Sequence, residues 1–201
     1  MQVAAEIDVA IAALQLHELE VREPRPDFDP EVAAAEAMAR AGRVADPAAA
    51  RALYRRFGVD PTRNRPSSEA LLRRVRRGDP LPRVNSLVDV ANVVSLRLQV
   101  PVGLYDLGRV EGPLRLRLGR EGESYAGIGR DQVGVAGRIC VADDLGACGN
   151  PSADSARTMI TVDTAEAAWI FFLPVVERDL RWTYELVARF GRGLVRLVDA
   201  A

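Results

Sequence analysis

The spacing of apolar residues changes once along this chain, and the change limits the folds that the sequence can form. Between residues 29 and 98 apolar side chains recur at helical spacing, most regularly over residues 87–98. From Leu114 to Leu118 leucines alternate with arginines, which is the period of a strand with one buried face. A run of helices followed by a run of strands predicts a mixed α/β (α+β) domain.

Helix signals divide residues 29–98 into four segments. Asp29-Pro30-Glu31 and Asp46-Pro47 each combine a capping residue with proline in the first turn, and the two helices that they open end at Gly42 and Gly58. Ser67 or Ser68 is expected to cap a third helix. The fourth helix, over residues 87–98, is expected to be the most buried.

Period-two patterns predict the strands. A long first strand is expected over residues 7–19, and further strands over 114–118, 138–142 and 158–162. The near-continuous apolar run 167–173 is typical of a central strand, and a closing amphipathic helix is expected over 180–194.

The composition indicates a cytoplasmic protein with no membrane partner. The chain has 201 residues, of which 48% are apolar and 27% charged, enough for one buried core. No segment reaches the roughly 18–20 apolar residues of a membrane span, and Glu6 and Asp8 stand where a signal peptide would carry positive charge.

Few kinds of active site are compatible with the polar residues. His17 is the only histidine and Cys140 and Cys148 are the only cysteines, so we predict reduced thiols, no metal site and no cofactor. No glycine-rich phosphate-binding loop is present. The carboxylates at Asp143, Asp144, Asp154 and Asp163 fit either turns or a site that binds a divalent ion or orients a water molecule.

Arginine is concentrated between residues 55 and 83. This stretch contains nine arginines but only three acidic residues, Asp60, Glu69 and Asp79. So high a positive charge indicates either a solvated helical face or a polyanion partner. The chain has no lysine, which weakens any inference from arginine alone. The four arginines of residues 73–77 also suit the C-terminal end of a helix, where cations are favoured.

Five segments, in this order, resemble a known family. They are Phe57-Gly58-Val59-Asp60-Pro61, Arg65-Pro66-Ser67-Ser68-Glu69-Ala70-Leu71, Leu81-Pro82-Arg83-Val84-Asn85-Ser86-Leu87-Val88-Asp89, Val100-Pro101-Val102-Gly103-Leu104-Tyr105-Asp106-Leu107 and Arg157-Thr158. Over roughly residues 50–175 the chain is similar to the B3/B4 tRNA-binding and editing domain of the phenylalanyl-tRNA synthetase β chain and its free-standing relatives. The resemblance divides the chain into an N-terminal strand and helix at 1–49, flanking the core, and a B3/B4-like domain at 50–201.

The resemblance implies a layered β/β/α fold with a cleft that, in the synthetase, accepts the 3′ end of a mischarged tRNA and hydrolyses its ester. Where the synthetase has a histidine, this sequence has Gly103, and no segment near residue 150 matches the synthetase's Gly-Gly-Glu, so no catalytic residue is assigned. The cleft is expected to contain Ser67, Ser68, Asn85, Asp89, Asn92, Gly103, Tyr105, Asp106, Asp154, Thr158 and Thr161.

Aminoacylated tRNA is therefore the expected partner, with Arg74, Arg77 and Arg83 as phosphate contacts, and DNA is not expected. Two alternatives remain open at this point. The chain could bind an amino-acid-like small molecule, or act on one as an enzyme of specialised metabolism, without tRNA. It could also be an oligomerisation or regulatory module, which an occluded cleft would favour.

Overall fold

The computed structural model describes residues 2–4 and 6–198 of the chain. Its helices are α1 (Asp29–Arg40), α2 (Ala48–Arg56), α3 (Ser67–Arg76), α4 (Ser86–Leu98) and α5 (Glu177–Leu186). Its strands are β1 (Gln2–Val3), β2 (Ala12–His17), β3 (Val102–Asp106), β4 (Arg115–Leu118), β5 (Ser124–Gly127), β6 (Arg130–Gly134), β7 (Ile139–Asp143), β8 (Gly146–Asn150), β9 (Ala153–Asp154), β10 (Ala167–Phe171) and β11 (Leu194–Val198).

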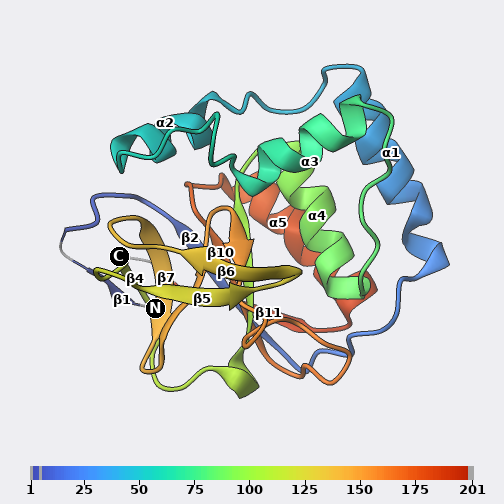
Figure 1. Cartoon of the computed structure of the whole chain (residues 1–201). Coiled ribbons are helices and arrows are strands. Elements are labelled where there is room, and N and C mark those ends of the chain that lie inside the picture. The colour runs from blue at the N-terminus through green and yellow to red at the C-terminus, as the bar shows by residue number, and fades with distance from the viewer. Residues whose placement is uncertain (1, 5, 199–201) are drawn as a thin grey trace.

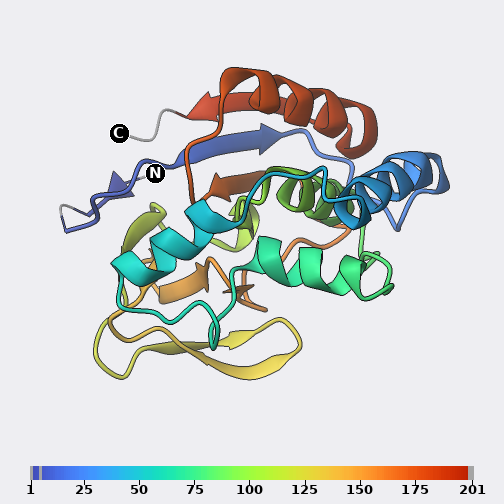
Figure 2. The same cartoon turned by 90° about the horizontal axis from the view of Figure 1, so that it is seen from above.

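Most of the strands form two sheets that pack face to face. One sheet has the order β1-β4-β7-β8-β9 and the other β11-β2-β10-β3, while β5 and β6 form a separate hairpin. Figure 1 shows α1, α3, α4 and α5 gathered on one side of the strands, and Figure 2 shows the β5–β6 hairpin, in yellow, at the edge of the molecule. The predicted mixed α/β class is confirmed.

The four-stranded sheet is the middle layer, because its two faces belong to two different cores. On β10, Trp169 and Phe171 pack with the helices, whereas Ile170 packs against the five-stranded sheet. On β3, Leu104 faces the helices and Tyr105 faces the second sheet. This alternation follows from the period of two along a strand. The resulting order of layers is sheet, sheet, helices.

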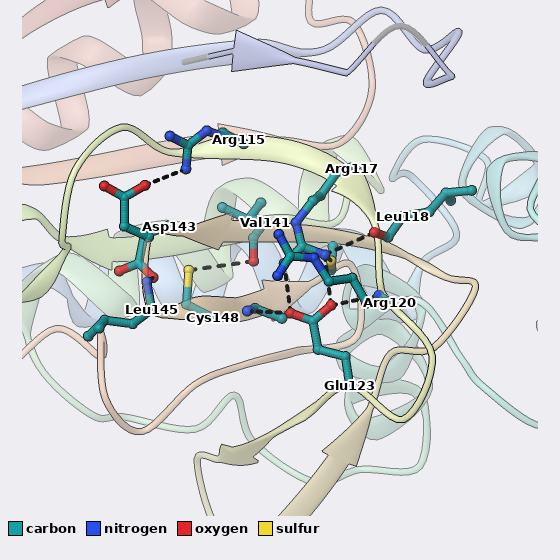
Figure 3. A network of polar contacts seen from close by, with 12 residues as sticks. Arg115, Arg117, Leu118, Arg120, Glu123, Val141, Asp143, Leu145 and Cys148 are labelled. Carbon is teal, nitrogen blue, oxygen red and sulfur yellow. Dashed lines mark hydrogen bonds and ion pairs between the residues drawn. The ribbon is translucent and has the colours of Figure 1, made fainter.

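A largely buried ion pair holds the segment that leads into the β5–β6 hairpin. Glu123, just before β5, accepts two hydrogen bonds of 2.7 Å from Arg117 of β4, and it also accepts from the backbone amides of Arg120 and Ala147 (Figure 3). Both side chains are 14% exposed. Since Arg117 stabilises the carboxylate, the pKa of Glu123 is lowered to about 2. The pair thereby connects β4, β5 and β8.

The predicted helices at 29–41, 47–57, 67–77 and 87–98 are present to within two residues, and α4 buries nine of its residues. The predicted serine cap of α3 is wrong: Pro66 is the N-cap, and no side chain caps the helix. Asn85 caps α4 instead, accepting from the Val88 amide at 2.9 Å.

Two strand predictions and one helix prediction need correction. The first strand is shorter than predicted and covers only Ala12–His17. Residues 158–162 form no strand. The Thr158 carbonyl accepts a single hydrogen bond from the backbone amide of Asp106, and Thr161 and Thr164 bond to each other in a turn. The closing helix ends at Leu186, and after a π-helical turn at Val187–Gly191 the chain forms β11.

Candidate functional site

A cavity of about 260 Å³ lies where α3, α4 and β3 meet the β5–β6 turn and the β8–β9 connection. Most of the side chains around it are apolar. It is lined by Ser67, Leu71, Val84, Val88, Ala91, Asn92, Ser95, Val102, Leu104, Ile128, Ser152, Ala153, Asp154, Met159 and Ile160.

Helix α4 supplies one wall of the cavity through a single face. Val88, Ala91, Asn92 and Ser95 are spaced i, i+3, i+4 and i+7, so they lie on one side of the helix. The cap residue Asn85 also donates from its side-chain amide to the Ile160 carbonyl at 3.3 Å. The N-terminus of α4 therefore positions the segment that brings Met159 and Ile160 to the cavity.

The opposite wall contains a buried carboxyl group. Asp154 of β9 accepts from the Leu104 amide at 3.2 Å through Oδ2, whereas its Oδ1 has less than 1 Å² of exposed surface and no hydrogen-bond partner among the described residues. Burial raises the pKa of Asp154 to about 7, although the Leu104 amide and the neighbouring Tyr105 hydroxyl oppose the shift. The hydroxyl of Ser67, at the start of α3, is likewise buried without a partner.

Tyr105 lies behind Asp154 and is completely buried between the two sheets. A Cβ atom at Gly103 or at Gly149 would lie less than 3.0 Å from the Tyr105 hydroxyl, so both glycines make room for this ring. The same Cβ at Gly149 would also lie 2.9 Å from Oδ1 of Asp154, which places the two polar groups side by side. The hydroxyl has no partner of acceptable hydrogen-bond geometry among the described residues. Gly103 thus has a packing role in this fold.

Of the residues predicted to form the cleft, Ser67, Asn92 and Asp154 line the cavity. The others do not line the cavity, and several make internal hydrogen bonds. Asp89 accepts from Arg83 at 2.6 Å, Asp106 accepts from Thr164 at 2.8 Å, and Thr158 donates to the Cys148 carbonyl at 3.5 Å. Ser68 is buried, Asn85 caps α4, and Thr161 accepts from the Asp163 amide at 3.3 Å. Their roles in binding stay predictions.

Sequence reasoning missed most of the apolar lining. Leu71, Val102, Leu104, Ile128 and Met159 carry no signal that separates a cavity wall from a packed core. The face of α4 could have been found, because Val88, Ala91 and Ser95 repeat the helical spacing that Asn92 shares.

The three predicted phosphate contacts lie in different settings. Arg83 bonds to Asp89, to Asp29 and to the Arg25 carbonyl, and its side chain is 27% exposed. Arg74 donates to the Pro80 carbonyl at 2.6 Å. Arg77 lies 3.7 Å from Asp79 at the exposed C-terminal end of α3. Phosphate binding by these arginines stays a prediction.

Two of the four carboxylates that were candidates for an ion site are paired with arginines. Asp143 pairs with Arg157 at 2.7 and 2.8 Å, and Asp144 pairs with Arg115 at 2.7 Å. Among the residues that the structure describes, no three His, Cys, Asp or Glu side chains form a group that could hold a metal ion. Within the same residues, no helix has the length and apolar content needed to cross a membrane.

Two stacked sheets and a layer of helices, with a largely apolar cavity between α3, α4 and β3, define the chain as a mixed α/β domain. The model of the B3/4 domain family matches residues 49–194, and the chain belongs to this family. The resemblance seen in the five motifs is thereby confirmed.

The curated relatives include phenylalanine–tRNA ligase beta subunits. The one from Bartonella henselae is 28% identical over 118 residues, which cover 58% of this chain, and the one from Ralstonia nicotianae is 32% identical over 121 residues, which cover 55%. The matches span only 14% and 15% of those proteins. Among solved structures, an N-terminal fragment of the phenylalanyl-tRNA synthetase beta subunit from Pyrococcus horikoshii aligns with a TM-score of 0.45 and 16% identity, covering 55% of this chain and 42% of the fragment.

Proposed function

We propose that this chain is a cytoplasmic protein that binds aminoacyl-tRNA, holds the aminoacyl group in the cavity and hydrolyses the ester of a mischarged tRNA in trans. Membership of the B3/4 family and the similarity to phenylalanine–tRNA ligase beta subunits support a tRNA-related substrate. The cavity of about 260 Å³ lies below the range of about 300–1,000 Å³ typical of pockets for larger ligands. An amino-acid side chain is a group of suitable size.

The observation that carries the proposal is the unpartnered carboxyl oxygen of Asp154 beside a largely apolar cavity. An aminoacyl ester is already activated, so the site has to position a water molecule and accept its proton. A carboxyl group with a pKa of about 7 is half ionised at neutral pH, which suits a general base. Asp154 lines the cavity and would accept the proton of the water, and the Ser67 hydroxyl is a donor for the ester carbonyl.

The test is deacylation of a panel of correctly charged and mischarged tRNAs by the purified chain. We expect at least one ester to be hydrolysed, and Asp154→Asn to lower the rate on the order of 100-fold, as for loss of a general base. Asp163→Asn is the matched control, because Asp163 is an exposed turn carboxylate and should leave the rate unchanged. If no tRNA is deacylated or bound in a salt-sensitive manner, the proposal is wrong.

A second function has one observation in its favour. Arg83 and Arg74, two of the three predicted phosphate contacts, are engaged by Asp89, Asp29 and the Pro80 carbonyl. A chain that binds an amino-acid-like small molecule without tRNA would need neither arginine free. Calorimetric titration with free amino acids and with aminoacyl-tRNA distinguishes the two functions, since only the small-molecule binder takes up the free ligand without the RNA.

A further inference from the structure

A second hollow, separate from the cavity, lies between α2 and α3 and is rich in arginine. Its volume is about 270 Å³, and it is lined by Pro47, Arg51, Glu69, Leu72, Arg73, Arg76 and Arg77. Glu69, Arg73, Arg76 and Arg77 fall at i, i+4, i+7 and i+8, so one face of α3 forms one side of this α2–α3 groove.

The single carboxylate in the α2–α3 groove is already neutralised. Glu69 accepts from Arg51 at 2.6 and 2.8 Å, and Arg65 lies 3.5 Å away. The bidentate bond from Arg51 and the nearby Arg65 charge lower the pKa of Glu69, so it remains ionised and paired. Its charge therefore does not compensate the other arginines.

Arg73, Arg76 and Arg77 carry the uncompensated charge. Within the described part of the chain, Arg73 makes no ion pair, and Arg76 makes only a 3.4 Å bond to the Ala39 carbonyl. Arg77 lies 3.7 Å from Asp79, in an exposed pair that contributes little. The dipole of α3 favours cations at its end, but it does not explain why three of them line a hollow beside a second helix. An anion would offset their mutual repulsion.

We propose that the α2–α3 groove binds phosphate groups of an RNA backbone through Arg73, Arg76 and Arg77. This inference rests on the proposed function for its choice of RNA as the anion. Ser67 lines the cavity and Arg76, nine positions further along α3, lines the groove. The two residues are about 14 Å apart along the helix axis and lie on opposite sides of a helix about 10 Å wide. A single strand of a few nucleotides is long enough to pass around α3, so an RNA with its aminoacyl end in the cavity can place its preceding phosphates in the groove.

The test measures binding of an uncharged tRNA by fluorescence anisotropy at several KCl concentrations. Each phosphate contact to a single strand contributes about 0.7 to the slope of log K against log salt, so Arg73→Ala/Arg76→Ala/Arg77→Ala should lower the slope by about 2. A rise from about 50 to about 200 mM KCl should then cost the wild type about 20-fold more affinity than the triple variant. The lysine triple variant Arg73→Lys/Arg76→Lys/Arg77→Lys should keep the slope, which excludes a fold defect.

The matched control is Arg115→Ala/Arg178→Ala/Arg181→Ala, which removes three charges from β4 and α5 and should leave the slope unchanged. If the alanine triple variant keeps the wild-type slope, the α2–α3 groove does not bind RNA phosphates. Hydrolysis of an aminoacyl ester of adenosine, which has no phosphate, separates the two proposals. If the wild type hydrolyses this ester and the alanine variant keeps the wild-type salt slope for tRNA, only the proposal for the groove is wrong. If the alanine variant has the lower salt slope and the wild type hydrolyses no ester, only the proposal of ester hydrolysis in the cavity is wrong.

Discussion

Replacement of Asp154 by asparagine should change how the stability of this protein depends on pH. In the folded chain burial raises the pKa of Asp154 to about 7, against an ordinary value of 3.8. Below pH 3.8 the carboxyl is protonated in both the folded and the unfolded chain. Between pH 3.8 and 7 the unfolded chain releases the proton while the folded chain retains it. The free energy of unfolding of the wild type therefore falls across this interval.

The size of the effect follows from the pKa difference of about 3, which corresponds to about 4 kcal/mol. This is the upper end, because the residue as a whole is only half-buried. Asparagine has the same shape, can accept from the Leu104 amide and does not titrate. The stability of Asp154→Asn minus that of the wild type should thus grow from pH 4 to pH 8 and then level off.

Urea denaturation followed by circular dichroism at one-unit pH steps measures this difference. All other titrating groups are shared by the two proteins, so their contributions cancel. A difference that stays constant between pH 4 and pH 8 would show that Asp154 titrates normally. The assignment of a near-neutral pKa to this carboxyl, and with it the general-base role, would then be refuted.

Two further substitutions test contacts that stabilise the fold. Glu123→Ala leaves Arg117 unpaired in a site where both side chains are 14% exposed, so urea denaturation at pH 7 should show a loss of about 3 kcal/mol; a loss below about 1 kcal/mol contradicts a buried pair. Because the pKa of Glu123 is lowered to about 2, the wild type should lose this advantage as the pH falls from 4.5 toward 2. Asn85→Ala should cost about 1 kcal/mol through loss of the α4 cap, and an unchanged denaturation midpoint would mean that Asn85 does not cap the helix.

Sequence reasoning located the helices well, because the signals that start and stop a helix are local. Asp29-Pro30 and Asp46-Pro47 lie at the starts of α1 and α2, and Gly42 and Gly58 follow their ends at positive φ. Strands depend on partners far along the chain and were less well predicted. β3 exists because it pairs with β10, some 65 residues later, and β11 pairs with β2 across almost the whole sequence.

The candidate site was only partly accessible to the same reasoning. The prediction selected polar residues for the cleft, but Asp89, Asp106 and Thr158 use their polar atoms for internal hydrogen bonds. The cavity wall itself is mostly apolar, and an apolar residue beside a cavity has the same sequence pattern as one in a packed core. The sequence marks Gly103 only as the position where the synthetase has a histidine. The structure shows that the absence of a side chain at Gly103 leaves space for Tyr105.

The most direct test of the account is the rate of deacylation of the best mischarged tRNA as a function of pH, after subtraction of the rate without protein. The wild-type rate should rise with pH around a midpoint close to 7, the pKa of the Asp154 carboxyl, and then level off. Asp154→Asn should give a low rate with no such midpoint. A wild-type profile without an inflection near this pH, or an asparagine variant that keeps the wild-type rate and profile, would contradict the central role of Asp154.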